Sequence, residues 1–348
     1  MTVRAKTAAL AVAVMLAAAP TFAATVTDGV AAYEGGDFAG ALKALTPFAQ
    51  MGEAQAQLTL GSMYVYGRGV PRDVPAGMSW IGKAAAQNNL DAQNEMGLIH
   101  HNGRAVTRNM DEALKWFRAA ANKGHPPAEY NLATMYWSGD GVMKDFSEAL
   151  TWFRKAADQN YPPAQMGLAA MYRDGEGIAR NDAEAVKWFR RAAEEHNVAP
   201  AQDALAMMYF DGRGVAKDDA AAVEWLRKAV AQNNGAAQYH MALAYLKGTG
   251  VPKDPSEAAK LFHRLADRKI PEGYQYLALM YGTGMGVPQD DVQAYRWTML
   301  SYMAGKGKPA SDDMETLHDL LETRMSTEQK RAAMREIMGA PDGKPQPQ

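Results

Sequence analysis

The chain contains no cysteine, and this absence excludes several kinds of chemistry. Disulfide bonds, thiol catalysis and every zinc site that uses sulfur ligands require cysteine side chains. The stability of the fold must therefore come from packing rather than from covalent cross-links or thiolate-bound metal.

The sequence also lacks a surplus of charge of either sign. With 37 Lys and Arg against 39 Asp and Glu, the formal net charge is −2 and the isoelectric point is about 6.4. A binding surface for nucleic acid or for an acidic membrane normally needs an excess of basic residues. These partners are disfavoured, whereas a hydrophobic content of 47% is enough for a large core.

Common motifs of catalysis and metal binding are missing as well. The sequence has no Gly-x-Ser-x-Gly or Ser-x-x-Lys stretch, and none of its seven histidines belongs to a His-Glu-x-x-His motif. Its 22 methionines do not favour a copper site, because five of them directly precede a recurring tyrosine position and are expected in the core. The sequence predicts no metal and no cofactor.

The N-terminus has the composition of a secretory signal peptide over residues 1–23. Arg4 and Lys6 precede an apolar run that ends at Ala19, and a small-residue cleavage site follows. We expect cleavage before Ala24 and a periplasmic mature chain. The apolar run is shorter than the ~20 residues of a comfortable membrane span, so a retained anchor is the lesser alternative. The mature chain has no cysteine that could carry a lipid anchor.

The stretch YGTGMGVPQDD, Tyr281 to Asp291, could be read as a phosphate-binding loop because its glycines are closely spaced. No Lys-Ser/Thr pair follows the glycines, however, and the stretch is one copy of seven. At steps of 36 or 37 residues the tyrosine position is occupied by Tyr64, His100, Tyr136, Tyr172, Tyr209, Tyr245 and Tyr281. A feature that recurs seven times indicates architecture rather than a nucleotide site.

Each copy has the features of a connector between two helices. Glycines stand three and five residues after the tyrosine position, except that the second glycine is Ala105 in the second copy, and they are typical of a helix end. A β-branched residue follows, and three residues later comes an expected N-cap of the next helix: Asp73, Asn109, Asp145, Asn181, Asp218, Asp254 or Asp290.

The two helices of each copy have complementary apolar faces. After the cap, apolar residues recur at helical spacing, as in Ala149, Trp152, Phe153, Ala156 and Ala157. Six of the seven tryptophans occupy the same position of this helix. Because the preceding helix has its own apolar face, we expect each copy to be two antiparallel helices that share one seam.

These residues resemble the Sel-one-like repeats, which are relatives of the tetratricopeptide repeats. The matching pattern is A-x-x-x-L-G/A-x-x-Y-x-x-G-x-G-V-x-x-D-x-x-x-A-x-x-W-F-x-x-A-A, as in Ala164 to Ala193. The resemblance implies an all-α fold, a right-handed superhelical solenoid of seven helix-turn-helix repeats of about 36 residues. It also implies a platform for protein partners, often in bacterial envelopes.

The segments that flank the repeats are expected to cap the array. The chain would then comprise a signal peptide over 1–23, an N-terminal capping hairpin over 25–55, seven repeats over 56–305, C-terminal helices over 306–340 and a disordered tail over 341–348.

The first helix of each repeat also has a face turned away from its own core. At 100° per residue, this face carries the positions two, six and nine residues after the first alanine of the repeat pattern. These positions differ between copies and hold several large side chains of the types that anchor protein interfaces. We predict a concave, partner-binding wall that includes His101, Tyr130, Trp137, Met166, Arg173, Phe210, Tyr239 and Leu246. The alternative is that a tight superhelix or the C-terminal helices bury this wall.

The first functional hypothesis is a monomeric, non-enzymatic periplasmic scaffold or adaptor that binds a protein or peptide, such as the periplasmic part of a membrane protein. The resemblance suggests envelope signalling, exopolysaccharide or cell-wall processes as contexts. A second hypothesis is an envelope hydrolase or a small-molecule binder, acting on a cell-wall fragment or a β-lactam through a groove carboxylate or His101. A third is a secreted effector that binds a host protein.

Overall fold

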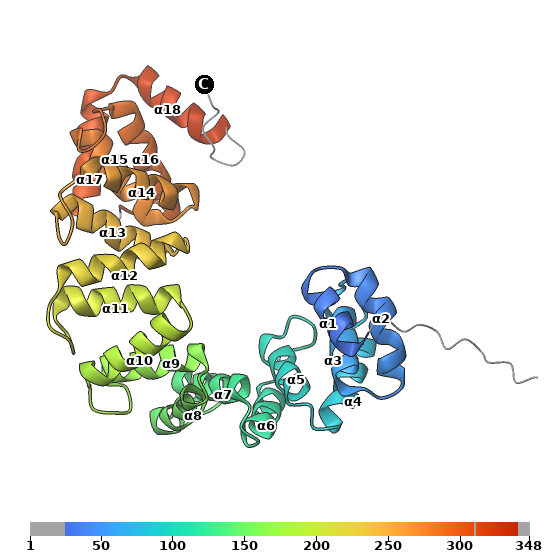
Figure 1. Cartoon of the computed structure of the whole chain (residues 1–348). Coiled ribbons are helices and arrows are strands. Elements are labelled where there is room, and N and C mark those ends of the chain that lie inside the picture. The colour runs from blue at the N-terminus through green and yellow to red at the C-terminus, as the bar shows by residue number, and fades with distance from the viewer. Residues whose placement is uncertain (1–24, 310, 340–348) are drawn as a thin grey trace, which may run out of the picture. The chain divides into compact units, whose positions relative to one another are not determined.

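The computed structural model describes residues 25–309 and 311–339, and the regular elements in this part of the chain are eighteen α-helices (Figure 1). The all-α prediction is confirmed. No helix among these residues is long and apolar enough to span a membrane. The predicted signal peptide, 1–23, and the predicted tail, 341–348, lie outside the described residues.

Fourteen of the helices form the seven predicted hairpins. The first helices of the hairpins are α3 (Ala54–Tyr66), α5 (Leu90–Asn102), α7 (Pro126–Ser138), α9 (Pro162–Asp174), α11 (Ala199–Asp211), α13 (Gly235–Lys247) and α15 (Pro271–Thr283). The second helices are α4 (Val74–Ala86), α6 (Met110–Ala121), α8 (Phe146–Asp158), α10 (Asp182–Glu195), α12 (Asp219–Ala231), α14 (Pro255–Asp267) and α16 (Asp291–Ala304).

The connectors within the hairpins have the predicted caps. The first glycine of each connector adopts a left-handed conformation, as Gly67 does with φ 68°, and ends the first helix. All seven predicted Asp and Asn residues cap the second helix: the side chain of Asp73, for example, accepts a hydrogen bond from the backbone N–H of Ala76 at 3.0 Å.

The second glycine of the connector has a separate role in stacking the repeats. A Cβ on Gly250 would lie 2.2 Å from the carbonyl oxygen of Asp219, and a Cβ on Gly286 would lie 2.4 Å from that of Pro255. Both oxygens belong to the second helix of the preceding repeat. Only glycine allows this close approach of two backbones, a requirement that the sequence pattern did not reveal.

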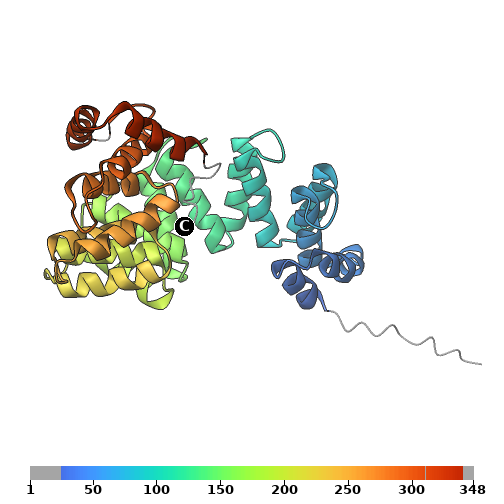
Figure 2. The same cartoon turned by 90° about the horizontal axis from the view of Figure 1, so that it is seen from above.

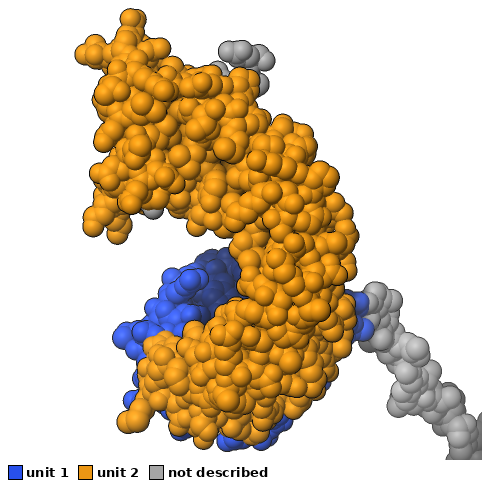
Figure 3. All heavy atoms as spheres, turned by 90° about the vertical axis from the view of Figure 1, so that its left-hand side faces the viewer, with its two compact units in different colours: residues 1–125 blue, residues 126–348 orange. Residues whose placement is uncertain are grey.

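The chain divides into two compact units, which meet in sequence between His125 and Pro126. Within each unit, each helix up to α16 packs against the helix that follows it in the chain, and α18 packs against α16. In the second unit the successive helices α10 to α14 lie side by side in both cartoon views (Figures 1 and 2). This unit alone curves into an arc that is hollowed on one side (Figure 3).

The cores consist of small residues at helix crossings and, in four of the hairpins, a buried phenylalanine. Phe117 is buried in the first unit, and Phe153, Phe189 and Phe262 are buried in the second. The five methionines that precede the recurring tyrosine are also buried, as predicted: Met63, Met135, Met171, Met208 and Met280. Methionine suits these sites because its flexible side chain fills irregular gaps.

The tryptophan position is less buried than its place in the apolar pattern predicts. Trp188 and Trp297 are buried, but Trp152 and Trp225 are half-buried. A lysine ammonium covers each of these two rings, with Nζ 3.8 Å from the ring centroid of Trp152 and 3.9 Å from that of Trp225. The rings therefore close the edge of the hairpin, and cation–π contact offsets their partial exposure.

Four helices flank the repeats. At the N-terminus, α1 (Val26–Glu34) and α2 (Phe38–Gln50) pack against each other and against α3. At the C-terminus, α17 (Asp312–Arg324) and α18 (Thr327–Gly339) pack against α15 and α16. Ser326 caps α18, since its backbone N–H donates to Gln329 and its hydroxyl accepts the N–H of Gln329.

Candidate functional site

Two adjoining hollows lie on the first helices of three consecutive repeats, α9, α11 and α13, within the second unit. Their volumes are about 540 Å³ and about 200 Å³, and both are lined by Met207, Asp211 and His240. We call them together the α9–α13 groove, whose lining includes Met166, Ala170, Arg173, Asp203, Met207, Phe210, Asp211, His240 and Leu243.

The spacing within each repeat explains why these residues meet. Seven of them stand at the positions predicted to face away from the core, two, six or nine residues after the first alanine of the repeat: Met166, Ala170, Arg173, Asp203, Met207, Phe210 and Leu243. Stacked repeats place equivalent positions next to one another, so one face of three helices becomes a continuous lining. The methionines, the leucine and Phe210 in this lining are half-buried and make it largely apolar.

A polar pair crosses the groove between neighbouring repeats. The carboxylate of Asp203 on α11 lies 2.7 Å from Nδ1 of His240 on α13, and Asp203 is only 9% exposed. An ionised carboxylate can only accept a hydrogen bond, so Nδ1 of His240 is the donor, and Nε2 is the ring nitrogen left to interact with a ligand. The ring of Tyr239 lies 5.5 Å from the imidazole and restricts its position.

One rim of the groove is an ion-pair network. The guanidinium of Arg173 donates two hydrogen bonds to Asp174, of 2.8 and 2.7 Å. Arg180 and Arg213 both donate to Asp182, with shortest distances of 2.8 and 2.9 Å. These contacts lower the pKa of both carboxyl groups: that of Asp174 chiefly through Arg173, and that of Asp182 through Arg180 and then Arg213. The arginines are therefore held by carboxylates of the rim.

Of the predicted wall residues, Met166, Arg173 and Phe210 come together in the groove. Trp137 is 38% exposed, and its Nε1 donates to Glu176 of the next repeat at 2.5 Å. Leu246 is half-buried against the core of the C-terminal repeats.

Tyr130 and Tyr239 lie against their own cores rather than standing free. The ring of Tyr130 is 5.8 Å from that of buried Phe153. Tyr239 lies 5.8 Å from the ring of Tyr276, which in turn stacks on buried Phe262 at 4.5 Å. Burial, aided by the contact with Tyr239, raises the pKa of Tyr276 to about 12. These tyrosines extend the core outward.

The eighth predicted wall residue, His101, belongs to the first unit. Its ring lies 6.4 Å from that of Phe117 in the same unit. The first unit has a hollow of its own, of about 260 Å³, whose lining includes Glu34, Asp91 and Glu95. Asp91 is bound to His125, at 3.0 Å, and Glu95 accepts the hydroxyl of Tyr66, at 2.6 Å.

Sequence reasoning did not single out His240, Asp211 or Arg213 as groove residues. His240 stands one residue beyond a wall position, and Asp211 is the last residue of α11. The available signal was the pairing of an acid with a histidine 37 residues later, close to the repeat length. A single pair of this kind is weak evidence without coordinates.

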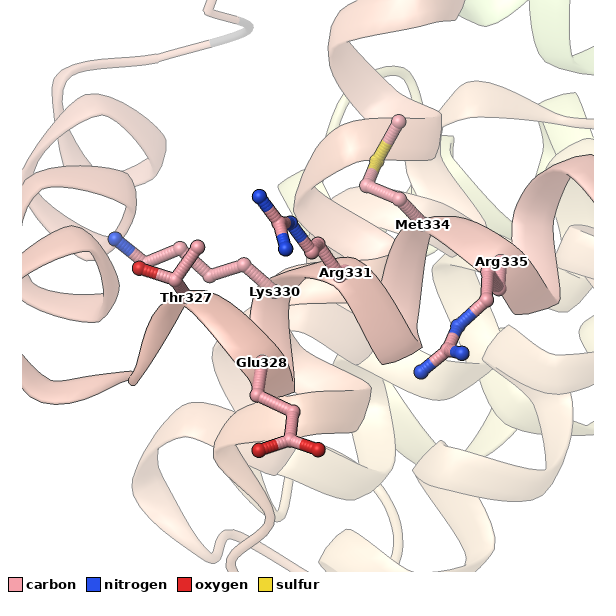
Figure 4. Close-up of a pocket in the computed structure, with 6 residues that line it drawn as sticks. All are labelled: Thr327, Glu328, Lys330, Arg331, Met334 and Arg335. Atoms are coloured by element: carbon pink, nitrogen blue, oxygen red, sulfur yellow. The ribbon is translucent and has the colours of Figure 1, made fainter.

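A larger hollow, of about 680 Å³, borders α18 (Figure 4). Its described lining comes from that one helix: Thr327, Glu328, Lys330, Arg331, Met334 and Arg335. Lys330 is held by Glu322, with Nζ 2.5 Å from the carboxylate. Because no second element among the described residues faces this surface, it is less suited to grip a ligand than the α9–α13 groove.

Residues 25–309 and 311–339 contain no group of three His, Asp or Glu side chains arranged to hold a metal ion. The helices α17 and α18 pack against α15 and α16, and they contribute no residue to the described lining of the α9–α13 groove.

Comparison with known proteins gives the repeats a family. The family described as Sel1 repeat matches seven times, at residues 54–89, 90–125, 126–161, 162–197, 199–234, 235–269 and 271–305. No match was found among curated proteins.

Two solved structures are similar over most of the chain. A Sel1 repeat protein from Oxalobacter formigenes is 30% identical, with 84% of this chain and 85% of that chain covered and a TM-score of 0.67. A protective antigen of uropathogenic Escherichia coli with an SLR fold is 28% identical, with coverage of 88% and 73% and a TM-score of 0.51. The chain therefore belongs to the Sel1 repeat family.

Proposed function

We propose that this protein is a non-enzymatic binding scaffold of the bacterial periplasm and that its α9–α13 groove holds a segment of a partner protein. Sel1 repeats in general mediate protein–protein interaction and form a non-catalytic fold. The observation that carries the proposal is the convergence of outward-facing positions from three successive repeats into one apolar groove.

The apolar groove residues lie at the margin of the hairpin cores. Met166 and Phe210 pack against these cores with part of their surface, and together with Met207 they also place apolar surface in the groove. Large side chains in a preformed hollow favour binding, because little conformational entropy is lost when a partner docks. The Asp203–His240 pair and the rim network fix the polar part of the groove before binding.

Export to the periplasm is the second part of the proposal. It rests on the composition of residues 1–23. Envelope signalling, exopolysaccharide or cell-wall assembly are the contexts that we favour. N-terminal sequencing of the protein from the periplasmic fraction is expected to begin at Ala24. Recovery of the full-length chain in the membrane fraction would instead indicate a retained anchor.

Site-specific photocrosslinking in living cells tests the binding function. A benzophenone amino acid replaces Phe210 in the groove, and the matched control replaces Lys187 on the second helix of an adjacent repeat, whose side chain is 68% exposed. We expect one discrete protein adduct at position 210 that is missing at position 187. Substitution at Phe210 exchanges one aromatic side chain for another and preserves most of the groove.

Two results would contradict the proposal. Equal labelling at both positions would show that contact at the groove is nonspecific. Internal crosslinks from position 210 to residues 311–339 would show that the C-terminal helices occupy the groove in solution.

A further inference from the structure

We infer that the α9–α13 groove selects a partner segment with a lysine or arginine side chain beside a bulky apolar residue. The inference rests on the proposed function and specifies the chemistry of the partner. It follows from which charges in the groove are already neutralised by the protein and which remain available.

The arginines of the groove are engaged by the rim. Arg173 is bound bidentately by Asp174, and Arg213 is bound by Asp182, at 2.9 Å, so neither guanidinium is free to attract an acidic partner. Breaking such charge-assisted hydrogen bonds would offset the gain from a new anion. On the other side of the groove, Lys217 and Asp219 form a looser pair, with Nζ 3.7 Å from the carboxylate. Lys247, the last residue of α13, is exposed and lines the same hollow.

The two carboxylates in the middle of the groove, Asp203 and Asp211, form no ion pair with a lysine or arginine among the described residues, although Lys247 lines the same hollow. Asp203 interacts with His240, which in its neutral form donates one hydrogen bond but leaves the carboxylate charge in place. Asp211 is exposed at the C-terminal end of α11, where the partial negative charge of the helix carbonyls adds to its own. Both hollows share Asp211 and His240, so a cation at this point would contact the two together.

The apolar lining sets the second requirement. Met207 and Phe210 lie beside the acidic centre, and Met166 and Leu243 lie farther along the lining on the neighbouring helices. The methylene stem of a lysine or arginine can pack on these side chains while its charged head reaches Asp211 and Nε2 of His240. An adjacent large apolar residue of the partner would fill the remaining hollow, of which about 540 Å³ adjoins Met166.

A library of displayed random twelve-residue peptides tests the inference on the purified protein. Selection is run in parallel on the wild-type chain and on a variant with both Asp203→Asn and Asp211→Asn. Both substitutions keep the shape of the side chain. The amide oxygen introduced by Asp203→Asn can still accept from His240, and an uncharged residue in place of Asp211 suits a helix C-terminus better than a carboxylate does. The matched control is Asp158→Asn, which removes an exposed carboxylate at the C-terminal end of α8 in the same unit.

We expect the wild type and the Asp158→Asn control to select peptides enriched in a basic residue next to a large apolar one. The Asp203→Asn/Asp211→Asn variant should lose this enrichment and bind a selected peptide about tenfold or more weakly, and the wild-type affinity should fall as salt rises. Circular dichroism of each variant verifies that the fold is retained.

The outcomes separate the inference from the function on which it rests. Peptides without a basic preference, or a basic preference that survives in the double variant, would overturn the inference and leave a protein-binding groove in place. The selected peptides are also tested on a Phe210→Glu variant, in which a charged side chain replaces the aromatic ring of the groove. If they all bind this variant as well as the wild type, they bind outside the groove, and both the inference and the proposed function fail.

Discussion

Gly248 and Gly250 provide a matched pair to test whether the second glycine of a connector is required for stacking of the repeats. Their φ angles are 76° and 70°, so alanine at either position introduces a similar backbone strain of about 1–2 kcal/mol. The surroundings of the two residues differ. A Cβ on Gly248 would approach only Lys253 of the same connector, with the Cβ of Lys253 at 3.2 Å.

A Cβ on Gly250 would instead meet the preceding repeat. It would lie 2.2 Å from the backbone oxygen of Asp219 and 2.9 Å from a methyl group of Val223. Relief of this overlap requires the two repeats to separate locally by about 1 Å, and such overpacking typically costs about 1–3 kcal/mol in addition to the strain. We therefore expect Gly250→Ala to lower the free energy of unfolding by about 2–5 kcal/mol and Gly248→Ala by about 1–2 kcal/mol.

Urea unfolding followed by circular dichroism measures the overall loss, and hydrogen exchange localises it. Local measurement is needed because repeat arrays can open in parts, so one global value can hide the effect. Gly250→Ala should lose amide protection where the α13–α14 connector packs on the first turn of α12. Gly248→Ala should lose little protection there. Equal destabilisation of the two variants, within about 0.5 kcal/mol, would refute the role assigned to the second glycine.

Three further predictions concern charge, core packing and backbone strain. Asp182→Asn should destabilise the protein at neutral pH. Because the pKa of Asp182 is lowered in the folded state, the difference in melting temperature between wild type and variant should shrink as pH falls below about 4. A difference that persists unchanged in strong acid would contradict this. Phe262→Ala removes a fully buried ring that stacks on Tyr276 and should cost about 3–5 kcal/mol in urea unfolding, against a much smaller effect of Phe262→Leu. Lys269 has φ 59° at a position where the first five repeats have asparagine or glycine, so Lys269→Gly should raise the melting temperature through a gain of about 1 kcal/mol. No gain would show that this strain is compensated elsewhere.

The sequence was sufficient for the fold because its constraints are local and repeated. The seven predicted N-caps each act within four residues of their own position, and the buried methionines follow from one spacing rule. Where one copy departs from the pattern, the other six copies still define the expected helices. The helix bounds and the hairpin pairing therefore agree with the pattern even in the second copy, where His100 and Ala105 depart from it.

The repeat pattern did not predict the role of the second glycine of the connector. Its recurrence indicated a turn, in which both glycines are left-handed. The structure adds that the second glycine also contacts a preceding helix about 31 residues away, as Gly250 contacts Asp219. The periodicity showed that the position is constrained without showing by what. The partly exposed tryptophans have the same origin, because apolar spacing gives the direction of a side chain but not how far a neighbour covers it.

The candidate site was the least predictable part, since its residues occur once each. Helical geometry placed Met166, Arg173 and Phe210 on one face, and the structure brings them into one groove. The same geometry did not indicate that Tyr130 would lie against Phe153, because a long side chain at the margin of that face can reach back to its own core. Nor could it pair Asp203 with His240, which requires the offset between two neighbouring repeats.

This division between fold and site follows from the architecture. Positions that hold the hairpins together must meet the same packing requirement in every copy, so the residues found there carry little information about a partner. Positions such as Asp203, Phe210 and His240 vary between repeats. The residues that occupy them can therefore determine binding specificity. In a repeat protein, the departures from the pattern within the groove are therefore stronger evidence about the ligand than the pattern itself.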